Sequence, residues 1–288
     1  MRYIIPLIIF CSFASASASG PGSTGGHILL LHSSAESASL SDSTAGIYGN
    51  LSAGQYNPAA LPGLSGVSLE LSHMIYFMDT FMTGFAYGHP IGPGGFGVRV
   101  KQFRAPDDER DYTGKKISGF DLVFTQYSLS GGVRVDPQQS LGAGVNIISE
   151  EYPGRKASSA GFDFGWTYLG EDGSSYGLTV RNVGRGMTLI NENIPLPLEA
   201  AFAGMHPLGV FRFTWELFRS AECKVGARSG LQLSMGDNFR ARLGLRYEGR
   251  LLFSSGFGIS MGNWVMDYAF TPDFSIGMAH RVSMGSRL

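Results

Sequence analysis

The chain has 288 residues, with 22 basic and 23 acidic side chains and a formal net charge of −1. This balance excludes the clustered positive charge by which proteins bind nucleic acid. The 41 glycines and the 12% aromatic content disfavour long helices and favour strands. The composition therefore predicts an all-β protein.

The N-terminus has the three-part pattern of a secretory signal peptide. Arg2 precedes an apolar run at residues 3–13, which is too short to span a bilayer as a helix. Alanines and serines follow, with a cleavage site of the Ala-x-Ala type after Ala16 or Ala18. We therefore expect residues 1–18 to be removed during export.

The two cysteines predict neither a lipid anchor nor a disulfide. Phe10 precedes Cys11, where a lipobox requires a small residue. The mature chain then keeps only Cys223, which cannot form an internal disulfide. We interpret Cys223 as a small apolar residue of a strand.

Two regions follow the signal peptide. Residues 19–66 are rich in Ser, Ala and Gly and contain too few large apolar side chains for a core of their own. Residues 67–288 form a long series of segments in which apolar and polar residues alternate, as in half-buried strands. We therefore expect an N-terminal plug and a β-domain.

The alternation predicts about fourteen strands. In residues 239–248, apolar residues from Phe239 to Tyr247 oppose arginines and a glycine. A soluble sandwich also alternates, but the aromatic apolar face, the number of strands and the signal peptide favour a transmembrane antiparallel up-and-down β-barrel. The predicted strands start near residues 67, 80, 95, 117, 141, 157, 175, 197, 209, 221, 239, 253, 264 and 274.

The connections predict an orientation. With the N-terminus in the periplasm, the even-numbered connections are short turns at residues 136–139, 170–173, 206–208 and 262–263. The odd-numbered connections include longer loops at residues 104–116 and 182–195, which would face outward. This pattern predicts location in the bacterial outer membrane.

Residues 46–61 resemble the N-terminal signature of the PorV/PorQ group of outer-membrane proteins, which is related to the long-chain fatty-acid transporter FadL. The matching residues are Asn57, Pro58, Ala59 and Leu61, whereas Ala60 replaces the usual glycine. Residues 180–184, 195–199, 267–270 and 280–284 are similar to later segments of that group. The resemblance implies a FadL-like barrel of fourteen strands, with the Asn57 motif in a plug inside it, close to the first strand.

Charged residues on the polar strand faces are expected to point into the lumen, because lipid would penalise them. Both signs occur, which favours cross-strand pairing around a plug, although a ligand or ion path is an alternative. The candidate lumen-lining charges are Arg99, Asp121, Asp163, Arg181, Arg212, Glu216, Arg228, Arg240, Arg242, Arg246 and Asp267.

Many glycines share the inward face. Without side chains they leave room for another backbone, for which residues 19–66 are the candidate, or they permit strands to bend. The two explanations are compatible. These glycines include Gly97, Gly142, Gly144, Gly161, Gly165, Gly226, Gly230, Gly256 and Gly258.

The sequence contains no recognisable enzyme or metal motif, so we expect no catalytic residues, metal or cofactor. The acidic stretch at residues 107–111 lacks the ligand spacing of a calcium loop, and we interpret it as solvated. Three functions fit the barrel: a plugged channel for small hydrophobic compounds, a PorV-like scaffold of type IX secretion that binds exported proteins, or a sealed structural barrel. Its expected partners are outer-membrane lipid and either a small hydrophobic ligand or secreted proteins.

Overall fold

The computed structural model describes residues 20, 22–189, 191–223, 225–273 and 277–288. The expected signal peptide at residues 1–18 lies outside these residues. Among the residues described, the helices are too short or too polar to be membrane spans.

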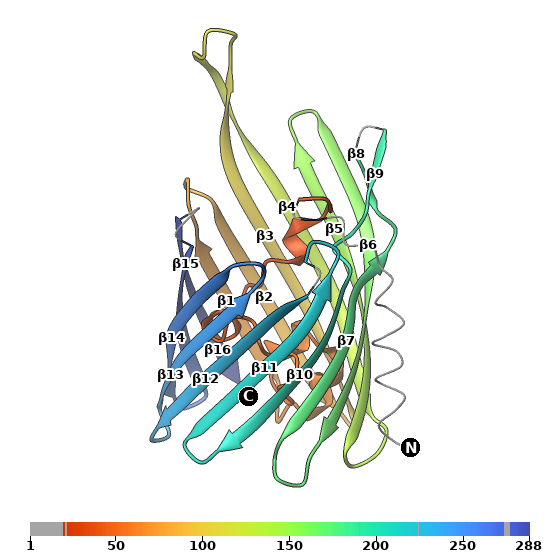
Figure 1. The fold of residues 1–288 in the computed structure, drawn as a ribbon, viewed down its shortest axis with the longest axis vertical. Helices are drawn as coiled ribbons and strands as arrows, with labels where there is room; N and C mark the ends of the chain where they lie inside the picture. Colours follow the sequence, from red (N-terminus) through yellow and green to blue (C-terminus); the bar gives the residue numbers. More distant parts are fainter. Residues whose placement is uncertain (1–19, 21, 190, 224, 274–276) are drawn as a thin grey trace.

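Fourteen antiparallel strands close into one barrel, in which β1 pairs with β16 (Figure 1). This confirms the predicted up-and-down barrel. Closure gives every wall strand a neighbour on both sides, so no strand lies at the edge of an open sheet. The wall strands are β1 (Ser68–Ile75), β2 (Phe81–Ile91), β3 (Gly94–Arg110), β4 (Lys116–Arg134), β5 (Gln139–Tyr152), β6 (Arg155–Leu169), β7 (Ser175–Gly184), β10 (Glu199–Leu208), β11 (Phe211–Ser220), β12 (Gly226–Met235), β13 (Phe239–Tyr247), β14 (Leu251–Met261), β15 (Trp264–Asp273) and β16 (Gly277–Arg287).

Short elements lie outside the wall. In the connection between β7 and β10, β8 (Met187–Leu189) and β9 (Glu192–Ile194) form a small separate hairpin. The described residues before β1, 20 and 22–66, contain four short helices and lie inside the barrel (Figure 1). These helices are η2 (His27–Leu29), α2 (Ala35–Ser39), η3 (Ala53–Gln55) and η4 (Pro58–Gly63).

The two faces of the wall differ as the alternation predicted. In β13, Leu243 is 63% exposed on the outside, whereas the neighbouring Arg242 is 2% exposed on the inside. Because successive side chains of a strand point to opposite faces, one local pattern assigns the whole strand. The exterior is therefore apolar and the interior polar.

Connections alternate between two rims of the barrel. The short-turn rim carries residues 92–93, 135–138, 170–174, 209–210, 236–238 and 262–263, and the C-terminus also lies there (Figure 1). The opposite rim, here the hairpin rim, carries the β3–β4 hairpin and the β8–β9 hairpin (Figure 1).

Residues 104–116 were predicted to be a loop, but most of them belong to the β3–β4 hairpin. β2 pairs with β3 as far as Arg104, and β4 pairs with β5 from Val123 onward. Beyond these points, residues 105–110 and 116–122 pair with each other and project from the barrel (Figure 1). Both faces of this ribbon meet solvent, and residues 104–110 show no apolar alternation, so the sequence predicted only the β4 half of the ribbon as strand.

Two other predicted boundaries were wrong. β12 begins at Gly226, five residues after the expected start near residue 221. The expected turn at residues 206–208 is the end of β10, and the turn itself falls at residues 209–210. Gly209 has a φ of 66°. Glycine adopts such a positive φ without strain, whereas the ring of Pro207 would not permit it.

Candidate functional site

Residues 20–66, here called the luminal segment, run from the hairpin rim to the short-turn rim. At the hairpin rim, the Gly25 N–H donates to the Pro195 carbonyl (2.9 Å) and the Gly26 N–H to Glu150 Oε1 (3.0 Å). Towards the short-turn rim, the Tyr48 hydroxyl lies 3.2 Å from that of Ser140. The segment therefore traverses the lumen before it joins β1.

An apolar cluster fills the lumen near the hairpin rim. Ile28 and Leu29 of η2 are buried against side chains from β5, β6 and the β7–β10 connection. The stacked rings of Phe103 and Phe124 pack beside this cluster. The wall residues of the cluster are Ile148, Ala157, Met187 and Leu196.

Inward glycines make room for the luminal segment. A Cβ built on Gly142 would lie 2.3 Å from the backbone nitrogen of Ala59, and one on Gly244 would lie 2.5 Å from that of Ser41. These neighbours are backbone atoms, so a side chain could not be accommodated by a rotamer change. Gly226 instead faces an aromatic ring of the adjacent strand. Space for another backbone thus explains some inward glycines, and space for wall side chains explains others.

Asn57 joins the luminal segment to the wall. Its side chain is fully buried, and Oδ1 accepts a hydrogen bond from the Ala59 N–H (3.0 Å), which caps η4. Nδ2 donates to the Ala45 carbonyl (3.0 Å) and to Thr167 Oγ1 on β6 (3.1 Å). Pro58 occupies the first position of η4, where its missing N–H costs nothing.

We expected the Asn57 motif to lie close to the first strand, but the structure places it elsewhere on the wall. Pro58 and Ala59 lie against Gly132 of β4 and Gly142 of β5, and Leu61 lies against Gly95 of β3. The segment reaches this side of the barrel before it returns to β1 at the short-turn rim. All four motif residues, Asn57, Pro58, Ala59 and Leu61, are buried.

The luminal segment carries two carboxylates, Glu36 and Asp42, and no lysine or arginine. Glu36 Oε1 lies 3.0 Å from Arg212 Nη2 and 3.8 Å from Arg242 Nη2. Asp42 Oδ2 lies 3.3 Å from Arg246 Nη1. Glu36 therefore pairs with arginines of β11 and β13, and Asp42 pairs with an arginine of β13. Breaking such a largely buried pair leaves an uncompensated charge, which is costly.

A second charge network ties four wall strands together. Glu199 of β10 accepts from Arg181 of β7, and its Oε2 lies 3.2 Å from Arg228 Nη2 of β12. Arg228 Nη1 also lies 2.7 Å from Glu216 Oε1 of β11. Opposite charges on neighbouring strands stabilise a sheet, and here they do so in a buried setting.

Ten of the eleven candidate charges point into the lumen, and Asp121 is the exception. Asp121 is exposed on β4 within the projecting ribbon, beyond the last residue paired with β5. The predicted inward position was wrong because Asp121 lies an odd number of residues from the inward Gln126 and Ser128, on the same face as the outward Tyr127 and Leu129. The inward ten are Arg99, Asp163, Arg181, Arg212, Glu216, Arg228, Arg240, Arg242, Arg246 and Asp267.

The sequence reasoning missed Glu36, Asp42 and His32. His32 is buried, its Nδ1 lies 3.5 Å from Asp42 Oδ2, and its ring centroid lies 4.1 Å from that of Tyr56. A usable signal was present, since Glu36 and Asp42 are the only acids in a segment that contains no lysine or arginine. Isolated carboxylates in a segment expected to be buried require cationic partners elsewhere in the chain.

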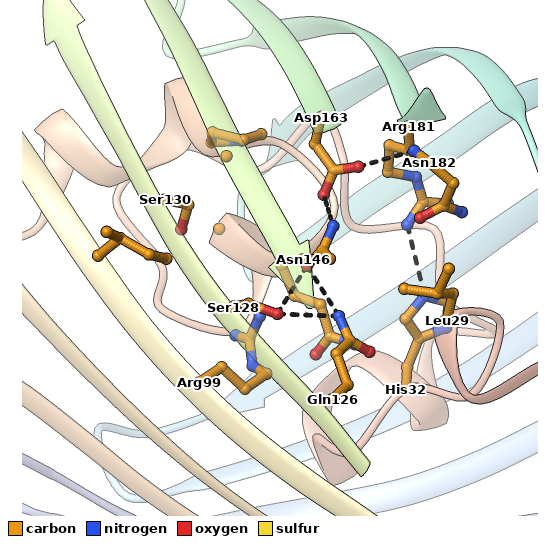
Figure 2. Close-up of a pocket in the computed structure, with 15 residues that line it drawn as sticks. Leu29, His32, Arg99, Gln126, Ser128, Ser130, Asn146, Asp163, Arg181 and Asn182 are labelled. Carbon is orange, nitrogen blue, oxygen red and sulfur yellow. Dashed lines mark hydrogen bonds between the residues drawn. The ribbon is translucent and has the colours of Figure 1, made fainter. Parts of the chain in front are cut away.

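Cavities remain between the luminal segment and the wall. Figure 2 shows one of about 20 Å³, large enough for about one water molecule, beside β3 to β7. Its wall is hydrogen-bonded, with Ser128 donating to Asn146 Oδ1 (2.6 Å) and Asn146 donating to Asp163 Oδ2 (2.7 Å). A larger cavity of about 220 Å³ lies near the hairpin rim, between the luminal segment, β1 and β13 to β16.

The acids of residues 107–111 form local ion pairs and hydrogen bonds within the projecting ribbon. Asp108 Oδ1 lies 2.5 Å from Lys116 Nζ, and Asp108 Oδ2 lies 2.9 Å from Arg110 Nη2. Hydrogen bonds from the Thr113 hydroxyl and from the backbone N–H of Lys115 lower the pKa of Asp111 below its usual range. Within the described part of the chain, no three His, Cys, Asp or Glu side chains are grouped so as to hold a metal ion.

No protein-family model and no curated protein matches this chain. Solved structures match its fold. The toluene transporter TodX of Pseudomonas putida has a TM-score of 0.66 at 11% identity, over 94% of this chain and 99% of that one. CymD, a monoaromatic hydrocarbon channel, has a TM-score of 0.64 at 13% identity, over 90% and 98%. A Pseudomonas aeruginosa FadL homologue has a TM-score of 0.63 at 12% identity, over 88% and 98%. The chain thus has the fold of these FadL-like barrels.

Proposed function

We propose that the protein is an outer-membrane channel for small hydrophobic compounds, with the luminal segment as its plug. The observation that supports this most is a closed fourteen-stranded barrel with an apolar exterior and a buried N-terminal segment in its lumen. Structures of the same fold include a toluene transporter and a monoaromatic hydrocarbon channel. Small hydrophobic compounds are therefore the substrate class that we infer.

The exterior supports location in a membrane. Large apolar side chains are exposed around the wall, among them Leu129 of β4, Leu243 of β13 and Met266 of β15. A soluble monomer rarely exposes a continuous apolar surface of this kind. The short-turn rim would face the periplasm and the hairpin rim the cell exterior, as in outer-membrane barrels.

Passage through the lumen requires the luminal segment to move. It spans both rims and is attached by the Glu36 and Asp42 ion pairs and by the hydrogen bonds of Asn57. Its single covalent link to the wall is at β1, so the rest can shift while the barrel stays closed. We infer that substrate entry at the hairpin rim is coupled to such a shift.

Planar-bilayer conductance and toluene uptake test this function. The intact protein is expected to conduct ions poorly, and deletion of residues 20–52 is expected to raise conductance while the barrel still folds. Cells that produce the intact protein are expected to take up radiolabelled toluene faster than cells with an unrelated closed barrel. Equal toluene uptake in the two strains would contradict a hydrocarbon channel.

A second candidate function is the binding of exported proteins at the cell surface, as in a PorV-like scaffold. The projecting ribbon at residues 105–110 and 116–122 favours it, because the ribbon offers a surface beyond the rim of the barrel. Deletion of residues 106–121 would then abolish co-purification of secreted proteins and leave toluene uptake unchanged. Loss of toluene uptake alone would count against the scaffold.

A further inference from the structure

Two cavities lie in one sector of the lumen, between the luminal segment and strands β1, β15 and β16. The outer cavity is the one of about 220 Å³ at the hairpin rim, and Met74 and Tyr76 of β1 line it. The inner cavity, of about 50 Å³, lies at the short-turn rim and is lined by Ser68 and Glu70 of β1 and by Arg287 of β16. The two cavities therefore lie along the same wall strands, one near each rim.

A single layer of inward wall residues separates the cavities. On β1 this layer is Ser72, because Glu70 lines the inner cavity and Met74 lines the outer one. The same comparison gives Ala269 on β15 and Ser283 on β16, since inward side chains recur at every second residue. All three side chains are small and buried, so they must be covered from the lumen.

Helix α2 of the luminal segment covers this layer. Ala35 and Ala38 of α2 form a buried cluster with Ala269 of β15. The Ala35 N–H also donates to Ser283 Oγ of β16 (3.3 Å). Glu36 lines the inner cavity and Ala38 lines the outer one. This five-residue helix is therefore the partition between the two cavities.

One charged side chain provides the main attachment of α2. Neutral hydrogen bonds join the backbone of the helix to the hydroxyls of Ser254 and Ser283 (3.1 and 3.3 Å). Glu36 instead forms ion pairs with Arg212 and Arg242 on β11 and β13. A helix this short has little stability of its own. Loss of the Glu36 ion pairs would therefore free α2 while the rest of the luminal segment keeps its contacts.

Charges of both signs line the two cavities. In the outer cavity, the buried Nε of Arg281 has no hydrogen-bond partner in the part of the chain that the structure describes. A hydrocarbon would leave such polar groups without solvation, whereas water and hydrophilic solutes can bond to them. The charged residues are Asp42, Arg246, Glu248, Asp273 and Arg281 in the outer cavity, and Glu36, Glu70, Arg240, Asp267 and Arg287 in the inner one.

We propose that this sector of the lumen conducts small hydrophilic solutes of amino-acid size, and that α2 is the local gate between the two cavities. The inference goes beyond the passage of hydrocarbons and rests only on the proposed membrane location. Space exists on both sides of α2, so displacement of this helix alone joins the two cavities. The attachments of the luminal segment at the hairpin rim and at Asn57 remain in place.

Glycine flux into liposomes that contain the purified full-length protein tests the route. Glu36→Gln, here the opened variant, removes the charge that holds α2 and is expected to raise glycine flux by about fivefold or more. Glu150→Gln makes the same change at the contact with Gly26 near the hairpin rim and is expected to leave glycine flux unchanged. Raffinose, a much larger solute, is expected to be excluded throughout. Equal rises in glycine flux in both variants, or entry of raffinose, would mean that the whole segment loosens and would overturn the local gate.

Disulfide locks distinguish a local gate from movement of the whole luminal segment. Both locks are built into the opened variant after its native cysteine is replaced by serine. The first lock pairs Ala38→Cys with Ala269→Cys, and the control pairs Ala45→Cys with Ala203→Cys, from a buried cluster beside β10. Oxidation of the first pair is expected to abolish glycine flux and dithiothreitol to restore it, whereas the control lock should have no effect. Loss of glycine flux in both locks, or in neither, would overturn α2 as the gate.

Thiol modification keeps the test decisive if a disulfide does not form. Thr271→Cys places a thiol in the outer cavity, where a small charged methanethiosulfonate is expected to react and to stop glycine flux in the opened variant. His27→Cys at the same rim is exposed and is expected to react without changing the flux. Failure of position 271 to react, or unchanged flux after it has reacted, would overturn the route. Toluene uptake is measured separately, so uptake of toluene without glycine flux would remove this route and leave the hydrocarbon channel.

Discussion

Neighbouring residues of one strand meet opposite environments in this wall. Arg242 Nη1 lies 2.6 Å from Asp267 Oδ1 inside the barrel, and Leu243 faces outward. A side chain of this strand therefore either pairs with a buried charge or is exposed on the apolar exterior. The consequences of substitution differ accordingly.

Leu243→Arg is expected to impair insertion, because an arginine at the bilayer midplane of a barrel costs roughly 2–4 kcal/mol. Arg242→Leu is expected to insert but to lose stability, because Asp267 and Glu36 lose a cationic partner. Heat-modifiable mobility and urea unfolding in vesicles measure the two effects. Normal assembly of Leu243→Arg together with failure of Arg242→Leu would mean that the faces are reversed.

Asn57→Ala is expected to loosen the luminal segment while the barrel remains intact. The variant loses the cap of η4, about 1 kcal/mol, and leaves the Ala45 carbonyl without its hydrogen bond from Nδ2. Hydrogen exchange should accelerate in residues 45–63 and stay constant in the wall strands. The control is Asn263→Ala in an exposed turn, which should change neither region.

At the scale of elements, the inward glycines and the luminal segment fit each other. The chain packs backbone to backbone where β5 passes η4, because a Cβ on Gly142 would meet the backbone of Ala59. Larger side chains at such positions would force the two elements apart.

Gly142→Val is therefore expected to displace η4 and raise single-channel conductance. The matched control is Gly131→Val on β4, where a Cβ has nothing nearer than the Gly95 carbonyl oxygen at 3.6 Å. Both changes place valine in a strand, so strand propensity affects them alike. Higher conductance in both variants would point to a disturbed wall, and unchanged conductance in Gly142→Val would argue against the plug.

At the scale of the whole molecule, the luminal segment has a direction. Its beginning is attached at the hairpin rim through Gly25 and Gly26, and its end joins β1 at the short-turn rim. With the hairpin rim outside the cell, the segment starts near the outer surface and ends in the periplasm. The two ends should therefore be accessible from opposite sides of the membrane.

Cysteine labelling in whole cells tests this topology. In a Cys223→Ser background, His27→Cys is expected to react with a membrane-impermeant maleimide in intact cells. Ser65→Cys is expected to react only after the outer membrane is permeabilised, and both residues are exposed in the folded barrel. The reverse labelling pattern would invert the orientation, and labelling of both positions only after permeabilisation would place the segment's start on the periplasmic side.

The strand pattern was readable from the sequence because side-chain alternation is a local property. Arg242 and Leu243 could be assigned to opposite faces from their neighbours alone, and the closed barrel followed from the number of such segments. The inward assignment of Asp121 was wrong, because along β4 Asp121 shares the face of Tyr127 and Leu129, which lies outside the barrel.

The sequence by itself thus determined the barrel, the two faces of its wall and the segment too polar and small to fold alone. Only the tertiary structure decided which arginines receive Glu36 and Asp42, where Asn57 attaches, and that α2 lies between two cavities. The physical reason is distance along the chain. Alternation is set by adjacent residues, whereas these contacts join positions that become neighbours only when the barrel closes around the luminal segment.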